Sequence, residues 1–422
     1  MAIEKEDENK KKGRKGSYPS ILSYLLGSFG GIKKGSLEEG RMGEDVVIKR
    51  VLESGRSRKE DEEAFEELRR INRERKGEDK RRAERLGKKL IDECRKEKEK
   101  ISLERVVKMV LEGADLNVLN GEDNFFKQTA LMWAAERGHE GVVEMLIKAG
   151  AKVDLQDNNG KTALMRAANG NQKRVLKLLI EAGANLDLQD NDGRTALMWA
   201  TLYDGGHKGV VEMLIEAGAN LDLQNNNGET ALMYAAVNGA EEILELLIKA
   251  GAKVDLQDND GRTALMWAAW YEHKRVVEML RKAGANVDPK YVSKDGKSLL
   301  MYAANGGLDG LAKELIDKGA KVDLQDNDGS TALMWAAEKG HERIVEMLLK
   351  AEADPFIVNN DGKTAYDLAG NEYIRGIIRS YGTVKKMEKG KKVREDEMRD
   401  ALEFMLRECS KKVGIIVSRM LS

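Results

Sequence analysis

Proline, cysteine and aromatic residues are all scarce in this chain of 422 residues. Proline occurs three times and aromatic residues make up 5% of the sequence, which suits a largely helical protein with solvated outer faces. The two cysteines, Cys94 and Cys409, are too few for a disulfide framework, and each lies in an amphipathic segment where it fits as a small buried hydrophobic residue. The composition therefore predicts a helical protein in a reducing compartment.

Net charge and long apolar runs are also missing. Lys plus Arg number 72 and Asp plus Glu 73, so no overall field draws the chain to nucleic acid or to an anionic membrane. The apolar stretch at residues 18–32 is interrupted by Ser and Gly, and it is much shorter than the ~20 residues of a membrane span. We expect a cytoplasmic protein, and the alternative for residues 18–32 is a peptide that docks on a membrane surface or a partner.

One heptapeptide recurs along the middle of the chain. TALMWAA begins at Thr129, and close variants begin at Thr162, Thr195, Thr230, Thr263, Ser298 and Thr331, with a shortened copy, TAYDLAG, at Thr364. Successive copies start 33 or 35 residues apart, and a period near 33 is typical of ankyrin repeats. Such a regular period predicts a stack of similar units instead of separate globular domains.

These residues resemble the ankyrin-repeat family over about residues 84–380. In one unit the family pattern is carried by Asp190, Gly193, Thr195, Leu197 and Ala200. The units depart from the pattern in two ways, since Ala or Leu replaces the family's Pro and Met replaces its His, but neither change alters the expected fold. The resemblance implies an all-α ankyrin-repeat solenoid of stacked antiparallel helix pairs with hairpin fingers, flanked by helical extensions.

The residues of one unit explain this pattern physically. Thr195 can cap a first helix, because its hydroxyl can accept a backbone N–H that has no partner in the helix. A buried apolar stripe is expected on each second helix. In an earlier unit, Gly150 ends such a helix in the left-handed conformation. Residues 186–193 then turn back as a finger, with Asx and Gly in the turn. One unit cannot bury its own apolar face, so stability must come from stacking between caps.

The same patterns predict the domain boundaries. These are a charged, partly disordered N-terminal region with short helices (1–82), an N-terminal capping helix pair (83–116), seven ankyrin repeats (117–363), a C-terminal capping repeat (364–382), and a basic linker with an amphipathic C-terminal helix (383–422). The N-terminal region extends the front cap or forms a separate assembly element, with a helix or strand at 45–53 and a helix at 60–75. The stripe that contains Met398, Leu402 and Met405 folds back on the stack or mediates self-association through residues 395–421.

No catalytic, cofactor or metal site is predicted. The four histidines occupy the same turn position in separate units, which favours a structural role; they are His139, His207, His273 and His341. The repeated DNDG stretch lacks oxygen ligands at the first and last positions of an EF-hand loop. The basic stretch at residues 385–394 has no interleaved aromatic residues and precedes three acidic ones, so a solvated tether is favoured over a nucleic-acid contact.

Candidate binding residues are those that vary between otherwise similar units. The resemblance implies that a partner binds the concave surface made by the fingers and first helices. Apolar and aromatic residues gather at the variable positions in mid-stack, charged residues gather at the finger tips, and two phenylalanines lie on an irregular finger. The predicted contact residues are Leu202, Tyr203, Val237, Trp270, Tyr271, Arg194, Glu229, Arg262, Phe125 and Phe126. The recurring tryptophans are interpreted as packing residues; they are Trp133, Trp199, Trp267 and Trp335.

The sequence thus predicts a non-enzymatic scaffold or adaptor whose partner is another protein. Nucleic acid is not the expected partner, and neither a cofactor nor a transmembrane segment is predicted. One alternative is a structural protein that oligomerises through its N-terminal region and C-terminal helix. Another is a microbial effector secreted into a host cell, which the near-copy repeats suggest.

Overall fold

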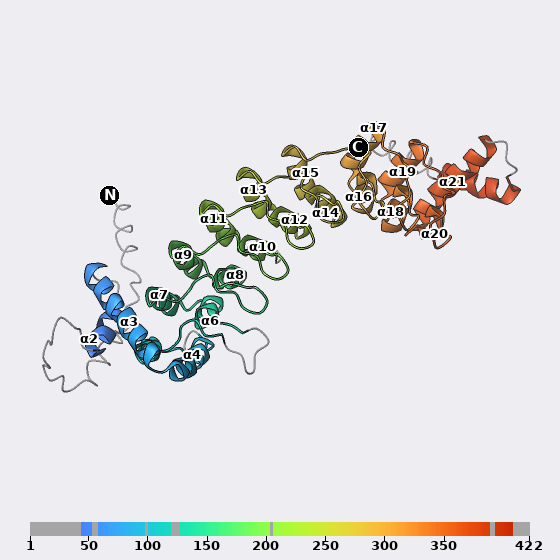
Figure 1. Ribbon diagram of the computed structural model, residues 1–422. Helices are drawn as coiled ribbons and strands as arrows, with labels where there is room; N and C mark the ends of the chain where they lie inside the picture. Colours follow the sequence, from blue (N-terminus) through green and yellow to red (C-terminus); the bar gives the residue numbers. More distant parts are fainter. Residues whose placement is uncertain are drawn as a thin grey trace, which may run out of the picture.

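The chain forms a curved stack of helix pairs (Figure 1). The computed structural model describes residues 44–52, 58–97, 100–119, 127–202, 206–388 and 393–407. Within these ranges every regular element is a helix, apart from one isolated antiparallel bridge between Val292 and Ser298. The predicted all-α solenoid is therefore confirmed.

The helices of the stack lie in two rows (Figure 1). The first helices, with the fingers, form the inner row: α4 (Lys80–Cys94), α6 (Ala130–Arg137), α8 (Ala163–Asn169), α10 (Ala196–Thr201), α12 (Ala231–Val237), α14 (Ala264–Trp270), α16 (Leu299–Asn305), α18 (Ala332–Lys339) and α20 (Ala365–Leu368). The second helices form the outer row: α5 (Leu103–Leu111), α7 (Glu140–Lys148), α9 (Lys173–Glu181), α11 (Lys208–Glu216), α13 (Glu241–Lys249), α15 (Lys274–Lys282), α17 (Asp309–Asp317), α19 (Glu342–Lys350) and α21 (Glu372–Glu388).

Local sequence signals set where these helices begin and end. The Thr195 hydroxyl accepts the backbone N–H of Met198 at 3.3 Å, and Thr162 caps α8 in the same way at 3.2 Å. Each such contact satisfies one of the N–H groups that lack a partner at a helix start. After the second helices the chain turns at glycines with positive φ, for example +79° at Gly183 and +88° at Gly218.

Consecutive units are joined by a continuous apolar core and by their histidines. Six first helices carry an alanine pair that is fully buried, as at Ala167 and Ala168 in α8, which allows neighbouring first helices to lie close together; these are α6, α8, α12, α14, α16 and α18. His207 Nε2 donates to the backbone carbonyl of Asn169 at 3.0 Å, and His273 Nε2 donates to that of Val237 at 2.8 Å. These histidines therefore link one unit to the next, which is a structural role.

Two helices extend the front of the stack. These are α2 (Glu44–Leu52) and α3 (Arg58–Glu78), and they pack against each other and against α5. The buried Asn72 amide donates to the carbonyls of Val110 at 2.6 Å and Ala114 at 3.1 Å, which fixes α3 to the end of α5. The segment expected to be a helix or a strand at residues 45–53 is thus helical over the part that the structure describes, residues 45–52, and this part lies on the front cap.

The C-terminal end differs from the sequence expectation in where the predicted linker begins. Helix α21 continues to Glu388, past residue 382 where a linker was expected, because residues 383–388 contain good helix formers and neither Gly nor Pro. Residues 395–407 form a further helix that folds back on α21 through Ala401, which is buried, and Phe404, whose ring centroid lies 5.9 Å from that of Tyr373. The predicted stripe of Met398, Leu402 and Met405 stays exposed.

Candidate protein-binding surface

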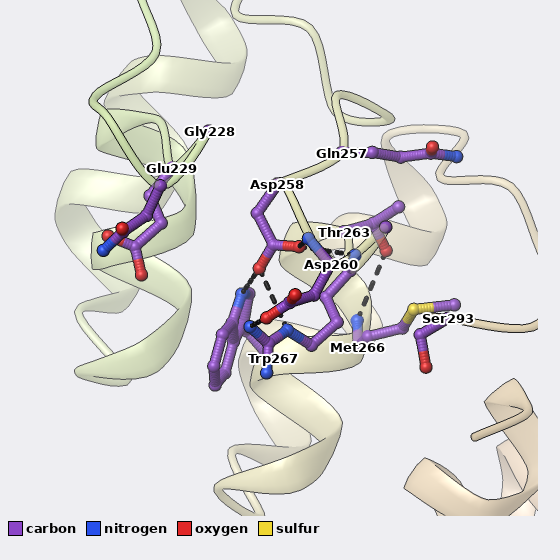
Figure 2. Close-up of polar contacts among 12 residues, drawn as sticks. Gly228, Glu229, Gln257, Asp258, Asp260, Thr263, Met266, Trp267 and Ser293 are labelled. Carbon is purple, nitrogen blue, oxygen red and sulfur yellow. Dashed lines mark hydrogen bonds and ion pairs between the residues drawn. The ribbon is translucent and has the colours of Figure 1, made fainter. Parts of the chain in front are cut away.

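The six fingers that precede α8, α10, α12, α14, α16 and α18 are each held by one buried polar side chain at the base. One Asp258 oxygen accepts the backbone N–H groups of Asp260 at 2.9 Å and Arg262 at 2.7 Å. The other oxygen accepts Trp267 Nε1 at 3.0 Å and Arg262 Nε at 3.0 Å (Figure 2). The finger turn is thus bonded directly to the indole of the helix that follows it.

The residue at the finger base changes together with the helix residue nine positions later. The pairs are Asp157 with Arg166, Asp190 with Trp199, Asn225 with Tyr234, Asp258 with Trp267, Ser293 with Tyr302, and Asp326 with Trp335. Indole and guanidinium groups only donate, so they face a carboxylate, whereas a tyrosine hydroxyl can donate and accept and so faces an amide or hydroxyl. This pairing is visible in the sequence, and it bonds three of the motif tryptophans to finger bases: Trp199, which is buried, and Trp267 and Trp335, which are half-buried.

Neighbouring fingers are also bonded to one another. The backbone N–H of Asn226 donates to the Asp192 carbonyl at 2.9 Å, and the Asn226 side-chain amide donates to the Asn191 carbonyl at 2.8 Å. Gln189 Nε2 donates to the Gln224 carbonyl at 2.9 Å. Equivalent asparagine rungs occur at Asn191, Asn259, Asn327 and Asn360. Because these bonds hold the fingers in place, little ordering entropy remains to be lost when a partner binds.

Five aromatic residues gather near the middle of the inner surface, and we call them the central aromatic cluster: Trp267, Trp270, Tyr271, Tyr302 and Trp335. The Trp270 ring centroid lies 5.3 Å from that of Trp335 and 5.7 Å from that of Tyr302, both edge-to-face. Trp267 stacks on Tyr271 with a centroid separation of 6.1 Å. Such pairs stabilise one another by about 0.5–1.5 kcal/mol beyond the area they bury.

Members of the cluster differ sharply in exposure. Tyr271 is 47% exposed, the three tryptophans are half-buried, and Tyr302 is only 2% exposed. Burial raises the pKa of Tyr302 to about 12, so its hydroxyl stays protonated beside the Ser293 hydroxyl, 3.3 Å away. Tyr271 is therefore the most exposed member of the cluster, and its ring stacks on Trp267.

Finger cations lie on the faces of these rings. Lys297 is only 9% exposed, and its Nζ lies 5.8 Å from the Trp270 centroid and 5.6 Å from the Trp335 centroid. The same Nζ lies 2.9 Å from the Asp295 carboxylate. The Arg262 guanidinium lies 4.3 Å from the Trp267 centroid. Cation–π contacts of this kind hold the cations against the surface instead of leaving them free in solvent.

The other predicted finger charges also have internal contacts. Arg194 forms an ion pair with Asp192 at 3.3 Å and lies 5.3 Å from the Trp199 centroid. Glu229 accepts a hydrogen bond from the Tyr234 hydroxyl at 2.9 Å. Arg194 and Glu229, on adjacent fingers, thus both lie beside Tyr234, and Arg262 lies against Trp267 of the central aromatic cluster.

The remaining predicted residues are placed as follows. Leu202 and Val237 are half-buried at the ends of α10 and α12, and their backbone carbonyls accept hydrogen bonds from Asn238 and His273 of the following units. Tyr203, Phe125 and Phe126 lie outside the described residues. Of the ten predicted contact residues, Tyr271 and Arg262 both contact the Trp267 ring, and among Trp270, Tyr271 and Arg262 only Tyr271 is exposed.

Comparison with protein families places the chain among known proteins. The family model for ankyrin repeats (three copies) matches residues 99–190, 141–225, 205–291 and 299–382. These matches cover more than half of the sequence, so the chain belongs to the ankyrin-repeat family. A search of curated proteins gives no match. Ankyrin repeats are in general scaffolds for protein–protein interaction, and the family is typically non-enzymatic.

Two further properties bear on the chemistry of the described residues. None of their helices combines the length and the apolar character needed to cross a bilayer. In the same ranges, no group of three or more His, Cys, Asp or Glu side chains is arranged so that it could hold a metal ion.

Proposed function

We propose that this chain is a non-enzymatic adaptor that holds a partner protein on its inner surface, with the central aromatic cluster as the main contact. The observation that supports this is the placement of Tyr271, which projects from half-buried tryptophans on a set of bonded fingers. Binding hot spots are typically a few aromatic or Arg side chains surrounded by polar groups that exclude water. Arg262 and the finger carboxylates provide such surroundings here.

Some members of the cluster pack against other units, and one lies mainly at the surface. This difference decides which variant tests the proposal. Trp270 contacts Trp335 and Tyr302, so its removal would disturb the stack as well as the surface. Tyr271 is the more exposed residue and follows the end of α14. A variant at Tyr271 therefore separates binding from folding better than one at Trp270.

We expect Tyr271→Ala to reduce partner capture about tenfold or more, because losing a hot-spot aromatic typically costs at least ~2 kcal/mol of binding free energy. The measurement is affinity capture with the full chain as bait, followed by quantitative mass spectrometry and a titration of each captured protein. The melting temperature should change little, because nearly half of Tyr271 is exposed and its loss removes one ring stack, on Trp267.

Phe356→Ala is the matched control for this experiment. Phe356 is an aromatic residue of similar exposure, 44%, on the finger that precedes α20, away from the central aromatic cluster. Its replacement should leave the captured proteins unchanged. Full retention of every captured protein by Tyr271→Ala would rule out the cluster as the contact.

A second candidate function is self-assembly through the C-terminal helix. Residues 395–407 pack on α21 through Ala401 and Phe404, yet Leu402 is 51% and Leu406 67% exposed on the same helix. Large exposed leucines on an amphipathic helix favour contact with another apolar surface. This observation supports the proposal that two copies of the chain pair through this helix.

The second proposal predicts a change of mass in solution. The wild-type chain should form dimers at micromolar concentration in light scattering, and the double variant Leu402→Glu and Leu406→Glu should be monomeric, since a dimer would bury its added charges. Arg407→Glu places an acid at an exposed position of the same helix and should leave the dimer intact. A monomeric wild-type chain at all concentrations tested would exclude this function.

A further inference from the structure

The front end of the inner row carries an unneutralised cluster of positive charge. Arg81, Arg82, Arg85 and Lys89 project from one side of α4, opposite the buried residues Ala83, Leu90 and Ile91, and we call them the basic face of α4. All four are exposed. In the described part of the chain, no carboxylate forms an ion pair with any of them.

The acids nearest to this face along α4 already have other partners. Glu84 pairs with Lys88 at 3.8 Å, and Asp92 pairs with Arg95 at 3.7 Å. The N-cap residue Asp79 accepts the backbone N–H of Arg82 at 3.0 Å, so its charge is directed at the helix end. None of these acids therefore forms an ion pair with the basic face.

This arrangement opposes the stability of the helix that carries it. Arg81 and Arg82 lie in the first turn of α4, where the helix dipole is positive, and that turn contains no acidic residue. Arg81 and Arg85 are four residues apart, as are Arg85 and Lys89, and like charges at that spacing repel each other on a helix. Residues that destabilise their own helix without an evident compensating contact commonly mark a functional surface.

The position of α4 leaves the basic face open to a ligand. Helix α4 packs on α3, α5 and α6, and it is the first helix of the inner row (Figure 1). Beyond it, this row continues into the fingers, where the exposed carboxylates of Asp192 and Asp260 form ion pairs with Arg194 and Arg262. A short acidic segment needs only the basic face, whereas a long polyanion would extend over fingers whose cations already have partners.

We propose that the basic face of α4 is a second interaction site, which binds an acidic segment of a partner polypeptide. From Arg81 to Lys89 the helix rises about 12 Å, a length covered by roughly four residues of extended peptide. A duplex nucleic acid fits less well, because its charge repeats along its whole length, whereas the cations of the basic face, which are unpaired among the described residues, cover only this short helix. The inference does not rest on the proposed function, since the central aromatic cluster belongs to α14, α16 and α18.

The test is the binding of a fluorescent peptide of about six glutamates, long enough to cover the face, to the full chain. In fluorescence anisotropy at low salt, Arg81→Glu with Arg82→Glu should weaken binding about tenfold, and the difference should shrink at high salt. The same double variant should melt at an equal or higher temperature, because it puts acids at the positive end of the helix dipole. Loss of binding would then not be due to unfolding.

Lys173→Glu with Lys274→Glu is the matched control. These exposed lysines begin α9 and α15 in the outer row, so the control changes the net charge by the same amount and also places acids in first turns. It should leave peptide binding unchanged. The basic stretch at residues 10–15, outside the described ranges, is present in both variants, so its effect cancels in the comparison.

Three results would overturn this proposal. The first is wild-type affinity of the Arg81→Glu and Arg82→Glu variant for the peptide, and the second is an equal loss in the Lys173→Glu and Lys274→Glu control. The third is a DNA duplex that binds more tightly than the peptide and is released by the α4 substitutions, which would assign the face to nucleic acid.

Discussion

Replacing Asp258 with Ala is expected to lower the free energy of unfolding by about 3 kcal/mol. The carboxylate is buried and accepts hydrogen bonds from two backbone N–H groups, from the Trp267 indole and from Arg262. Its removal leaves these donors without partners at the base of the finger. Urea denaturation followed by circular dichroism measures the loss, and hydrogen exchange should place it in this finger and its neighbours.

A set of substitutions copied from the chain itself tests the cause of that loss. Asp258→Asn alone turns an amide N–H toward the indole N–H, and we expect it to cost about 2 kcal/mol. Adding Arg262→Glu and Trp267→Tyr recreates the polar set one finger earlier, around Asn225. The triple variant should recover most of the lost stability. If it is no more stable than Asp258→Asn, the hydrogen-bond pairing does not explain the pattern.

Gly306→Ala is expected to destabilise the stack by about 3 kcal/mol, at the upper end of what overpacking usually costs. Gly306 follows α16 and lies against the end of α14, where an added methyl group would overlap the backbone carbonyl oxygen of Ala269. That oxygen is part of a helix and cannot move aside as a flexible side chain would. The contact between α14 and α16 is also fixed by Asn305, whose amide donates to the Trp270 carbonyl at 3.0 Å.

Gly310→Ala is the control for this prediction, and its effect should have the opposite sign. Gly310 lies four residues later, in α17, and a methyl group there would meet nothing within 4 Å. Because Ala is the better helix former, the variant should gain about 0.5–1 kcal/mol. Thermal and urea denaturation of both variants give the comparison. Similar melting temperatures for the two would contradict the close approach of α14 and α16.

The close approach also changes how one pair of variable positions is understood. In the sequence, Asn305 and Gly306 occupy the same slots as Trp270 and Tyr271, so all four look like surface residues that differ between units. In the structure Asn305 and Gly306 are buried between units, and the Asn305 carbonyl accepts His341 Nε2 at 2.9 Å. Their identity therefore reflects packing between units.

The fold could be predicted from the sequence because its determinants are local and repeated. A hydroxyl cap such as Thr195, a buried alanine pair and a stop glycine such as Gly183 act within one unit, and the 33-residue period shows that the units stack. The candidate surface was only partly predictable. Lys297 has the sequence position of a finger-tip charge, yet it is held between two tryptophans of other units.

What the sequence by itself determined is therefore the ankyrin class of the chain, the order of helix and finger in each unit, and the residues that depart from the repeat. Only the tertiary structure decided which of those residues project from the surface. Trp270 and Tyr271 are neighbours in the sequence, but the Trp270 ring packs on Trp335 of a unit two repeats later while Tyr271 turns to solvent. The physical reason is that exposure in a solenoid depends on how each unit lies against the next, which the local pattern of one unit does not contain.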